Sequence, residues 1–538
     1  MSLPKKKAIL SIDVGTTNLK VCIFSGDNCA LIYGQTEEIL LITSKDDQNV
    51  EIDPEQLWTQ LLTMVRNAVT EADKMNLNLV GIGLSCQRNS FVTLNRKTLE
   101  PCHLIITWKD RRAKEFCDKW NNSYKRKLLN LIGFIAFTLT RSERFKAAQM
   151  FRLLDVMIAP RFLVTLEKNS KMQELLSTND LIVATLDCWI LQKLTNNLQV
   201  LITEPSSASS TGLFDPFTGT WGKQILQLIG FPFSSVILPF LSKTSLLSLK
   251  TDSSLFGKEI RISSCLGDAQ AAIFGSGCFQ KGDVNLTLGT GALLDFVTGE
   301  DVHASMCGGV YPLIGWKLDN NSPVYLLESK FNNVISSLKL AFSLDLNSSP
   351  SSEDLNKHCE ELFSNDVLID DRESDLIFIP SFFGSERSYG GRDCSALFGI
   401  CSSTTKDQIK RSIYLSIVFG IYQIWTNLLS QSSTNDLKQL KRIRCCGGVS
   451  LNNFFCQQIS TLINLPLERV SEPQFCSAKG VALLAGFAND LWNFDQIKDF
   501  ISVERRFEPL CLEQRNSLIY KYNYWLDLQK HFGIVPNL

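Results

Sequence analysis

The stretch Ser11-Ile12-Asp13-Val14-Gly15-Thr16-Thr17-Asn18-Leu19-Lys20 decides how this chain folds. One apolar run, residues 8–12, leads into its turn, and a second, residues 21–24, leads out of it. Two apolar segments around a short turn that contains glycine predict a β-hairpin. The turn would offer backbone N–H groups and two threonine hydroxyls to an anion, and the carboxylate of Asp13 lies beside them for a cation.

The same arrangement returns at Val284-Asn285-Leu286-Thr287-Leu288-Gly289-Thr290-Gly291-Ala292-Leu293-Leu294. Gly15-Thr16 and Gly289-Thr290 are 274 residues apart, close to half of the 538-residue chain. A single Gly-Thr pair is more often an ordinary surface turn. Two at this spacing predict a duplicated fold that binds a polyphosphate between its halves.

The length of the chain predicts two large domains, and its composition excludes several classes of function. The net charge is −1, so no broad basic face for nucleic acid is expected. The seventeen cysteines contain no C-x-x-C pair and no zinc spacing with the four histidines, which is typical of a reducing cytoplasm. We expect no secretory leader, because the first apolar run has only five residues. We expect no transmembrane segment, because the apolar run at 413–425 carries polar residues and predicts a buried core helix.

Alternating strands and helices in both halves predict an α/β architecture. Asp53-Pro54 suits the N-cap and first position of a helix that continues to about residue 74. The remaining expected elements are strands at 31–41, 80–85, 260–266 and 443–446, helices at 180–194, 452–465, 478–489 and 520–532, a loop at 204–212, and an exposed insertion at 344–375.

The residues of the first hairpin suit phosphoryl transfer, which needs charge neutralisation and precise placement of the reacting groups. Asp13 can hold Mg²⁺, since such sites take one or two carboxylates together with phosphate oxygens and water. Thr16, Thr17 and Thr290 can donate hydrogen bonds to phosphate oxygens, and Lys20 adds a positive charge.

Three further motifs each follow a predicted strand. Asp268, in Cys265-Leu266-Gly267-Asp268-Ala269, would begin a helix and project a carboxylate that can act as a general base. The alternative is a simple helix cap. Gly447-Gly448 would let the backbone approach a flat ring such as adenine, unless it is only a tight turn. Arg88 and Trp108 can shape a small polar pocket, although exposed arginines that form salt bridges are the competing interpretation.

In this order, these segments resemble the FGGY carbohydrate kinases, and within them the glycerol kinase branch, over residues 8–509. The motifs that carry the resemblance are Asp13-Val14-Gly15-Thr16-Thr17, Gln87-Arg88, Trp108 with Arg111-Arg112, Gly267-Asp268, Leu288-Gly289-Thr290-Gly291, and Gly447-Gly448 with Asn452-Asn453.

The resemblance implies two actin-like ATPase (ribonuclease H-like) α/β domains with the active site in the cleft between them. The implied boundaries are 5–264 for the N-terminal domain, 265–510 for the C-terminal domain and 511–538 for a helical tail. It also implies transfer of the γ-phosphoryl group of ATP to a small polyol, with Mg²⁺ at Asp13 and Asp268 as the base. Nucleotide would contact Thr16, Thr17, Lys20, Gly289, Thr290, Gly447, Gly448 and Asn452, and substrate would contact Arg88, Asn89, Trp108 and Asp268.

The chain departs from the family pattern at several of these motifs. Asn89 and Ala269 stand where glycerol kinases have glutamate and glutamine, and Cys446 and Leu415 stand where acids are usual. Three functions therefore stay open: a glycerol kinase, a kinase for another polyol or ketose, and a regulatory pseudokinase that binds nucleotide. The sequence does not decide between a monomer and a homo-oligomer.

Overall fold

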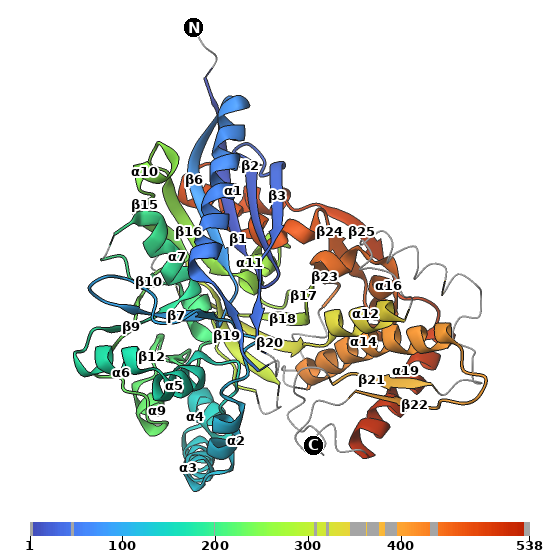
Figure 1. Cartoon of the computed structure of the whole chain (residues 1–538). Coiled ribbons are helices and arrows are strands. Elements are labelled where there is room, and N and C mark those ends of the chain that lie inside the picture. Colours follow the sequence, from blue (N-terminus) through green and yellow to red (C-terminus); the bar gives the residue numbers. More distant parts are fainter. Residues whose placement is uncertain are drawn as a thin grey trace. The chain divides into compact units, whose positions relative to one another are not determined.

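The computed structural model (Figure 1) describes residues 4–44, 48–197, 199–305, 309–318, 322–344, 362, 376–381, 395–430 and 440–531, with backbone only at 245–248. The chain forms two compact units. Unit 1 comprises Met1–Phe279, Val297–Leu327 and Cys476–Ile501, and unit 2 comprises Gln280–Phe296, Glu328–Phe475 and Ser502–Leu538. The predicted insertion at 344–375 lies outside the described residues, apart from residues 344 and 362.

The strands of unit 1, apart from β19, which pairs with β20, form two six-stranded sheets and two-stranded ribbons. The central sheet has the order β15-β16-β6-β1-β2-β3, and the second has the order β13-β9-β7-β8-β5-β4 (Figure 1). The strands are β1 (Lys6–Val14), β2 (Asn18–Ser25), β3 (Leu31–Glu38), β4 (Ile42–Thr43), β5 (Val50–Ile52), β6 (Leu77–Cys86), β7 (Phe91–Asn95), β8 (Ile105–Ile106), β9 (Leu181–Thr185), β10 (Ile202–Thr203), β11 (Phe214–Asp215), β12 (Thr220–Trp221), β13 (Val236–Ile237), β14 (Phe240–Leu241), β15 (Ser245–Lys250), β16 (Arg261–Gly267) and β19 (Val310–Trp316).

The helices of unit 1 come from distant parts of the chain. They are α1 (Pro54–Lys74), α2 (Lys114–Asn122), α3 (Tyr124–Thr140), α4 (Glu143–Gln149), α5 (Ile158–Lys168), α6 (Ser170–Ser177), α7 (Leu186–Thr195), α8 (Pro205–Ser209), α9 (Lys223–Leu228), α10 (Ser253–Phe256), α11 (Asp268–Gly275), α17 (Cys476–Ala488) and α18 (Phe494–Asp499).

The alternation of side chains along β1 explains how the central sheet is covered on both faces. Leu10 and Ile12 belong to the same buried cluster as Leu57 and Leu61 of α1. Ser11 points the other way and donates from Oγ to the carbonyl oxygen of Ala478 in α17, at 2.8 Å. Helix α1 begins as predicted, since the side chain of Asp53 accepts from the N–H groups of Glu55 and Gln56.

Helices α11 and α17 approach each other through glycine. A Cβ added at Gly480 would overlap the carbonyl oxygen of Ala271, and one added at Gly275 would overlap the carbonyl oxygen of Cys476. The start of α11, which carries Asp268, is therefore packed directly against α17.

Two of the expected elements are wrong. Residues 180–194 are not one helix, because strand β9 occupies Leu181–Thr185 and only then does α7 begin. A short apolar run fits a buried strand and a buried helix equally well, so periodicity cannot separate them. Residues 204–212 are not only a loop: they contain the short helix α8, whose residues are all buried.

Unit 2 contains a mixed sheet in which β18, β17, β23, β24 and β25 are neighbours in that order. Strands β18 (Ala292–Gly299) and β20 (Val324–Phe331) each contain a boundary between the units. The other elements are β17 (Val284–Leu288), β21 (Ile377–Ile379), β22 (Ala396–Phe398), β23 (Ile443–Cys446), β24 (Leu467–Val470), β25 (Val503–Phe507), α12 (Val334–Ser343), α14 (Lys406–Leu429), α16 (Asn453–Ile463), α19 (Leu512–His531), η2 (Gly448–Leu451) and η3 (Pro473–Phe475).

Helix α14 is the predicted core helix. By length and composition it could cross a membrane, and it is the one helix of the described residues that passes this test. However, 67% of its most apolar window is buried inside the protein. Phe419 packs against Tyr522 and Trp525 of α19, so the terminal helix covers α14 instead of lying free.

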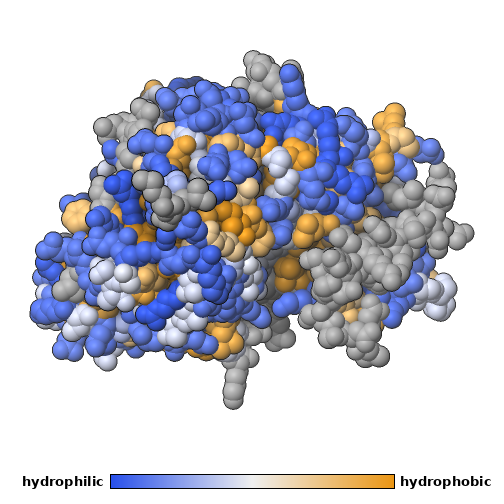
Figure 2. All heavy atoms as spheres, turned by 90° about the horizontal axis from the view of Figure 1, so that it is seen from above, coloured by the Kyte–Doolittle hydropathy of each residue, from blue (hydrophilic) through white to orange (hydrophobic). Residues whose placement is uncertain are grey.

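Most of the surface shown in Figure 2 belongs to hydrophilic residues, with separate hydrophobic patches among them. No disulfide bond joins the fourteen cysteines that the structure describes.

We predict that Gly480→Ala destabilises the protein by about 1–3 kcal/mol, because the new methyl group cannot fit without separating α11 from α17. Thermal and urea unfolding would measure the change. Gly289→Ala is the matched control, since a Cβ at Gly289 meets no atom within 4 Å among the described residues. Equal stability of the two variants would contradict the prediction.

Candidate active site

Strand register places Asp13 between two polar partners from neighbouring strands. Asp13 lies opposite Lys20 in β2 and opposite Ser85 in β6. Its Oδ1 accepts from Ser85 Oγ at 2.8 Å, and its Oδ2 lies 3.3 Å from Lys20 Nζ. The side chain is only 3% exposed. The carboxylate is therefore held in one orientation, with a cation on one side.

A closed chain of hydrogen bonds joins the first hairpin to two other predicted segments. Gln87 Nε2 donates to the carbonyl oxygen of Gly15 at 3.1 Å, and Gln87 Oε1 accepts from Ser90 Oγ at 3.1 Å. Ser90 Oγ accepts from the N–H of Trp108 at 3.3 Å, and Trp108 Nε1 donates to Thr16 Oγ1 at 2.7 Å. We call these five residues the hairpin ring.

The hairpin ring has a chemical consequence for Thr16. A hydroxyl has one hydrogen to donate and can accept elsewhere. Because Trp108 Nε1 occupies an acceptor position of Thr16 Oγ1, the hydroxyl hydrogen of Thr16 is directed away from the indole. Residues predicted separately for phosphate and for polyol are thus in direct contact.

Asp268 begins α11, as predicted, and lies beside Arg88. Arg88 Nε is 3.9 Å from Asp268 Oδ1, and the two side chains are 10% and 31% exposed. Gly267 makes this approach feasible, since a Cβ at that position would lie 2.9 Å from Cγ and Cδ of Arg88. Asp268 Oδ1 also accepts from the N–H of Ala269 at 2.9 Å. The carboxylate thus stays accessible while its position is fixed.

A buried arginine that the motif analysis missed supports this half of the site. Arg161 in α5 is fully buried and donates to the carbonyl oxygens of Asn89, Thr107, Val156 and Met157. Burial lowers the pKa of its guanidinium to about 10, which leaves it charged at neutral pH. One cation therefore fixes the two loops that carry Arg88, Asn89 and Trp108.

A buried glutamate behind Gly267 was also missed, because the 204–212 segment was expected to be a loop. Glu204 accepts from Thr244 Oγ1 at 2.5 Å and from the N–H of Ser206 at 2.6 Å. Ser206 Oγ in turn accepts from the N–H of Gly267 at 2.8 Å. Burial raises the pKa of Glu204 to about 7. An acidic residue before a Ser/Thr-rich run was the available signal.

In unit 2, the second predicted hairpin forms and meets the predicted adenosine turn. Leu288 pairs with Ala292 across the hairpin that contains Gly289 and Thr290. Gly447 has φ of +94°, and a Cβ there would overlap the backbone of Leu288. Glycine is thus required both by the backbone conformation and by the contact. Gly289 and Gly448 face open space, with no described atom within 4 Å of an added Cβ.

Another buried arginine, Arg469, fixes the position of the segment after Gly448. Its Nη1 donates to the carbonyl oxygen of Ser450 at 2.9 Å and to Asn453 Oδ1 at 3.0 Å. Asn452 caps α16, since its side chain accepts from the N–H of Phe455 at 3.2 Å. Cys446, in place of the usual acid, contacts Thr287 Oγ1 at 3.5 Å.

The residues present are compatible with binding of ATP and Mg²⁺. The two open glycines leave room for a ligand against the backbone, as a phosphate chain or a flat ring requires. The described residues contain no group of three or more His, Cys, Asp and Glu side chains arranged for a metal ion. Asp13 alone suits Mg²⁺ that is bound mainly through phosphate and water.

The sequence matches two domains of a known protein family. The N-terminal domain of the FGGY family of carbohydrate kinases matches residues 8–143 and 166–275, and the C-terminal domain of that family matches residues 284–489.

The chain belongs to the FGGY family of carbohydrate kinases. It is 33% identical to human glycerol kinase 5 over 515 residues, which covers 95% of this chain and 93% of the relative. It is 28% identical to glycerol kinase of Bacillus anthracis over 523 residues, with 96% and 97% of the two chains covered. These findings confirm the predicted family and its glycerol kinase branch, including the animal glycerol kinase 5 type.

The fold of this FGGY kinase is shared with solved structures. Plasmodium falciparum glycerol kinase with ADP superposes with a TM-score of 0.80 at 22% identity, over 98% of this chain and 99% of the other. A xylulose kinase from Lactobacillus acidophilus gives a TM-score of 0.73 at 18% identity, over 98% of both chains. The predicted α/β class with two actin-like ATPase (ribonuclease H-like) domains is confirmed.

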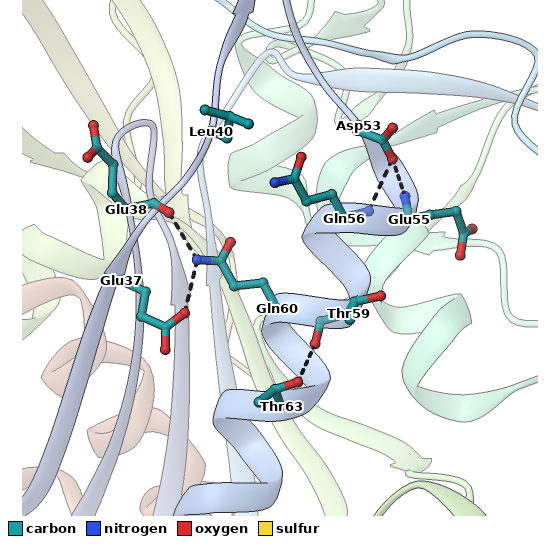
Figure 3. Close-up of a pocket in the computed structure, with 9 residues that line it drawn as sticks. All are labelled: Glu37, Glu38, Leu40, Asp53, Glu55, Gln56, Thr59, Gln60 and Thr63. Carbon is teal, nitrogen blue, oxygen red and sulfur yellow. Dashed lines mark hydrogen bonds between the residues drawn. The ribbon is translucent and has the colours of Figure 1, made fainter.

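A separate cavity in unit 1 does not contain any of the predicted site residues. It has a volume of about 650 Å³ and lies between the end of β3 and the start of α1 (Figure 3). Gln60 crosses it and donates from Nε2 to Glu37 Oε2 at 3.2 Å and to the carbonyl oxygen of Glu38 at 2.9 Å. The polar groups of its wall thus bond to one another.

We predict that Trp108→Phe and Thr16→Val each weaken nucleotide binding about 2–10-fold, since each removes the bond that orients the Thr16 hydroxyl. The double variant should lose less than the product of the two effects, because both changes break one interaction. Calorimetry with ADP would measure the binding of each variant. Trp221→Phe is the control, because Trp221 Nε1 donates to the carbonyl oxygen of Pro239 and not to Thr16. Full additivity would show that the bond does not couple the two residues.

We predict that Glu204 makes the folded state less stable as pH rises. Its pKa is about 7 in the folded protein and 4.5 for an ordinary glutamate, so the unfolded chain loses its proton first. Between pH 4.5 and 7 the free energy of unfolding should therefore fall relative to that of Glu204→Gln, by on the order of 1–3 kcal/mol. Urea unfolding at several pH values would measure it.

The control for that experiment is Glu174→Gln, a substitution at an exposed position in α6. The difference in the free energy of unfolding between Glu174→Gln and the unaltered protein should not change with pH. If Glu204→Gln behaves in the same way, Glu204 does not titrate in this range.

Proposed function

We propose that this protein is an ATP-dependent kinase that transfers the γ-phosphoryl group to a hydroxyl of a small polyol, with glycerol as the first candidate. The observation that carries the proposal is the pairing of Asp268 with Arg88 in a chain that belongs to the FGGY carbohydrate kinases. An accessible carboxylate can act as the general base for a polyol hydroxyl, and the arginine beside it can bind another hydroxyl of the same substrate.

In the proposed reaction Asp268 accepts the proton of the attacking hydroxyl as that oxygen bonds to phosphorus and the bond to the ADP leaving group breaks. Arg88 donates to a neighbouring hydroxyl, and the indole of Trp108 packs against carbon atoms. Asn89 Oδ1 is buried and accepts no hydrogen bond from any residue that the structure describes. A polyol hydroxyl is a suitable donor for it.

On the nucleotide side, Thr16, Thr17 and Lys20 would bind phosphate oxygens from the first hairpin, and Gly289 and Thr290 from the second. Gly447, Gly448 and Asn452 would lie along the adenosine. Asp13 would contact Mg²⁺, which supplies neutralisation of the phosphate charge when bound. The name of the Plasmodium structure, glycerol kinase with ADP, supports a nucleotide for this fold.

Two observations bear on which polyol is the substrate. The names of the human and bacterial relatives support glycerol. Asn89 and Ala269 are smaller than the residues that glycerol kinases have there, which suits a larger polyol or ketose as well. The free thiols support the cytoplasm as the compartment.

The decisive experiment measures ADP release with Mg-ATP and a panel of glycerol, other small polyols and ketoses. We expect turnover with glycerol or a close analogue, and a loss of about 10²–10⁴-fold in kcat for Asp268→Asn, since the base is removed. ATP affinity should stay within a few-fold. Asp118→Asn is the control, because Asp118 is an exposed residue of α2 whose carboxylate pairs with Lys114.

Two results would change the conclusion. Turnover that survives Asp268→Asn would remove Asp268 from the role of base. ATP binding without transfer to any member of the panel would favour the regulatory pseudokinase. Four departures from the family pattern are consistent with that function: Asn89, Ala269, Cys446 and Leu415.

A further inference from the structure

Helix α3 exposes an apolar face of unusual extent. Seven of the eighteen large exposed hydrophobic residues that the structure describes lie on this single helix. They are Tyr124, Leu128, Leu131, Ile132, Phe134, Ile135 and Leu139. Each is between 50% and 80% exposed. Such clustering is unlike the scattered single apolar residues that are normal on a protein surface.

The positions of these residues place them on one side of the helix. Tyr124, Leu128, Leu131, Ile135 and Leu139 follow the spacing that aligns side chains along a helical face. An amphipathic surface helix normally turns this face toward the core of the protein. Here the apolar face is the exposed one.

The opposite side of α3 attaches the helix to unit 1. Gly133 is the buried residue of the helix, and a Cβ there would lie 2.5 Å from the N atom of Gln149, next to α4. Asn130 Nδ2 donates to the carbonyl oxygen of Gln149. Figure 1 shows α3 at the outer end of the group that it forms with α2 and α4. The helix is therefore held by the side that carries Gly133 and Asn130, where Leu129 also packs against a buried cluster of unit 1.

The stretch of sequence that contains α3 is strongly positive although the chain as a whole is close to neutral, and one of its cations, Arg144, pairs with Asp215. Residues 123–152 carry seven lysines and arginines and one acidic residue, Glu143, for a net charge of +6, against −1 for the whole chain. Helix α3 has no acidic residue. Lys125, Arg126 and Lys127 lie in its first turn, and Arg141 follows its end.

The exposed apolar face and the basic residues of α3 together identify the chemistry of its partner. We propose that α3 docks on an anionic lipid surface, with its axis along the membrane plane, its apolar face among the acyl chains and its basic ends against the headgroups. Apolar residues on one face with lysine and arginine beside them are typical of interfacial helices. With 17 residues α3 is about 25 Å long, so it is too short to span the bilayer core of about 30 Å.

Charge argues against a second copy of this chain as the partner. Antiparallel pairing of two α3 helices would bring Arg141 of one copy beside Lys125 and Lys127 of the other. Parallel pairing would align the lysines of both copies. Like charges would meet in either arrangement without an acidic residue between them.

Sedimentation with vesicles tests the proposal. We expect the full chain to bind vesicles of phosphatidylcholine with 30% phosphatidylserine at least tenfold more strongly than vesicles of phosphatidylcholine alone. Leu131→Ser/Ile135→Ser should lower binding to the anionic vesicles at least tenfold, and Lys125→Glu/Lys127→Glu should remove the preference for anionic lipid. Thermal unfolding should be unchanged, since all four side chains are exposed.

The matched control is Ile400→Ser/Leu512→Ser, which removes two other exposed apolar side chains, 63% and 69% exposed, and should bind vesicles normally. Absence of vesicle binding, or equal binding by the α3 variants, would overturn the proposal. So would a dimer in sedimentation velocity without lipid that the α3 variants dissociate, because α3 would then be an interface between copies. These outcomes are independent of whether the protein is an active kinase.

Discussion

The register of three adjacent strands is the constraint on which the first half of the candidate site depends. Strand β1 pairs with β2 on one side and with β6 on the other, and both registers bring a polar residue opposite Asp13. A shift of one residue would turn Asp13 to the other face of the sheet. The same pairing brings Gly15 beside Gln87, since each follows the end of its strand. The hairpin ring and the position of Arg88 then follow from the connections of these strands.

A second organising interaction is the buried arginine that binds backbone carbonyl groups. Arg161 holds the loops that carry Asn89 and Trp108, and Arg469 holds the segment between Gly448 and Asn453. A guanidinium group has five N–H donors in a fixed plane, which suits several carbonyl oxygens at once. Loops that would otherwise move are thus fixed by the protein before a ligand arrives, and this lowers the entropic cost of binding.

Much of this arrangement could be predicted from the sequence because it is local. The two hairpins and the cap at Asp53 depend on residues within a few positions of one another. The roles of Arg161, Arg469 and Glu204 could not be predicted in this way. Their partners are carbonyl oxygens or hydroxyls that lie elsewhere in the chain and, for Arg161, up to 72 residues away, and a backbone carbonyl leaves no mark in the residue types. Strand β9 was missed because its four apolar residues and Thr185 run directly into a helix.

If the second hairpin and the Gly447 turn bind the nucleotide as proposed, the contact between Gly447 and Leu288 has a consequence for how nucleotide preference can change in this family. The tip of the second hairpin and the turn after β23 touch through backbone atoms, without a side chain between them that could be exchanged. Any side chain at position 447 would therefore push the two segments apart. A nucleotide that required a different distance between its base and its terminal phosphate could not be accommodated by altering either segment alone. Divergence toward other donors would have to begin with both segments together.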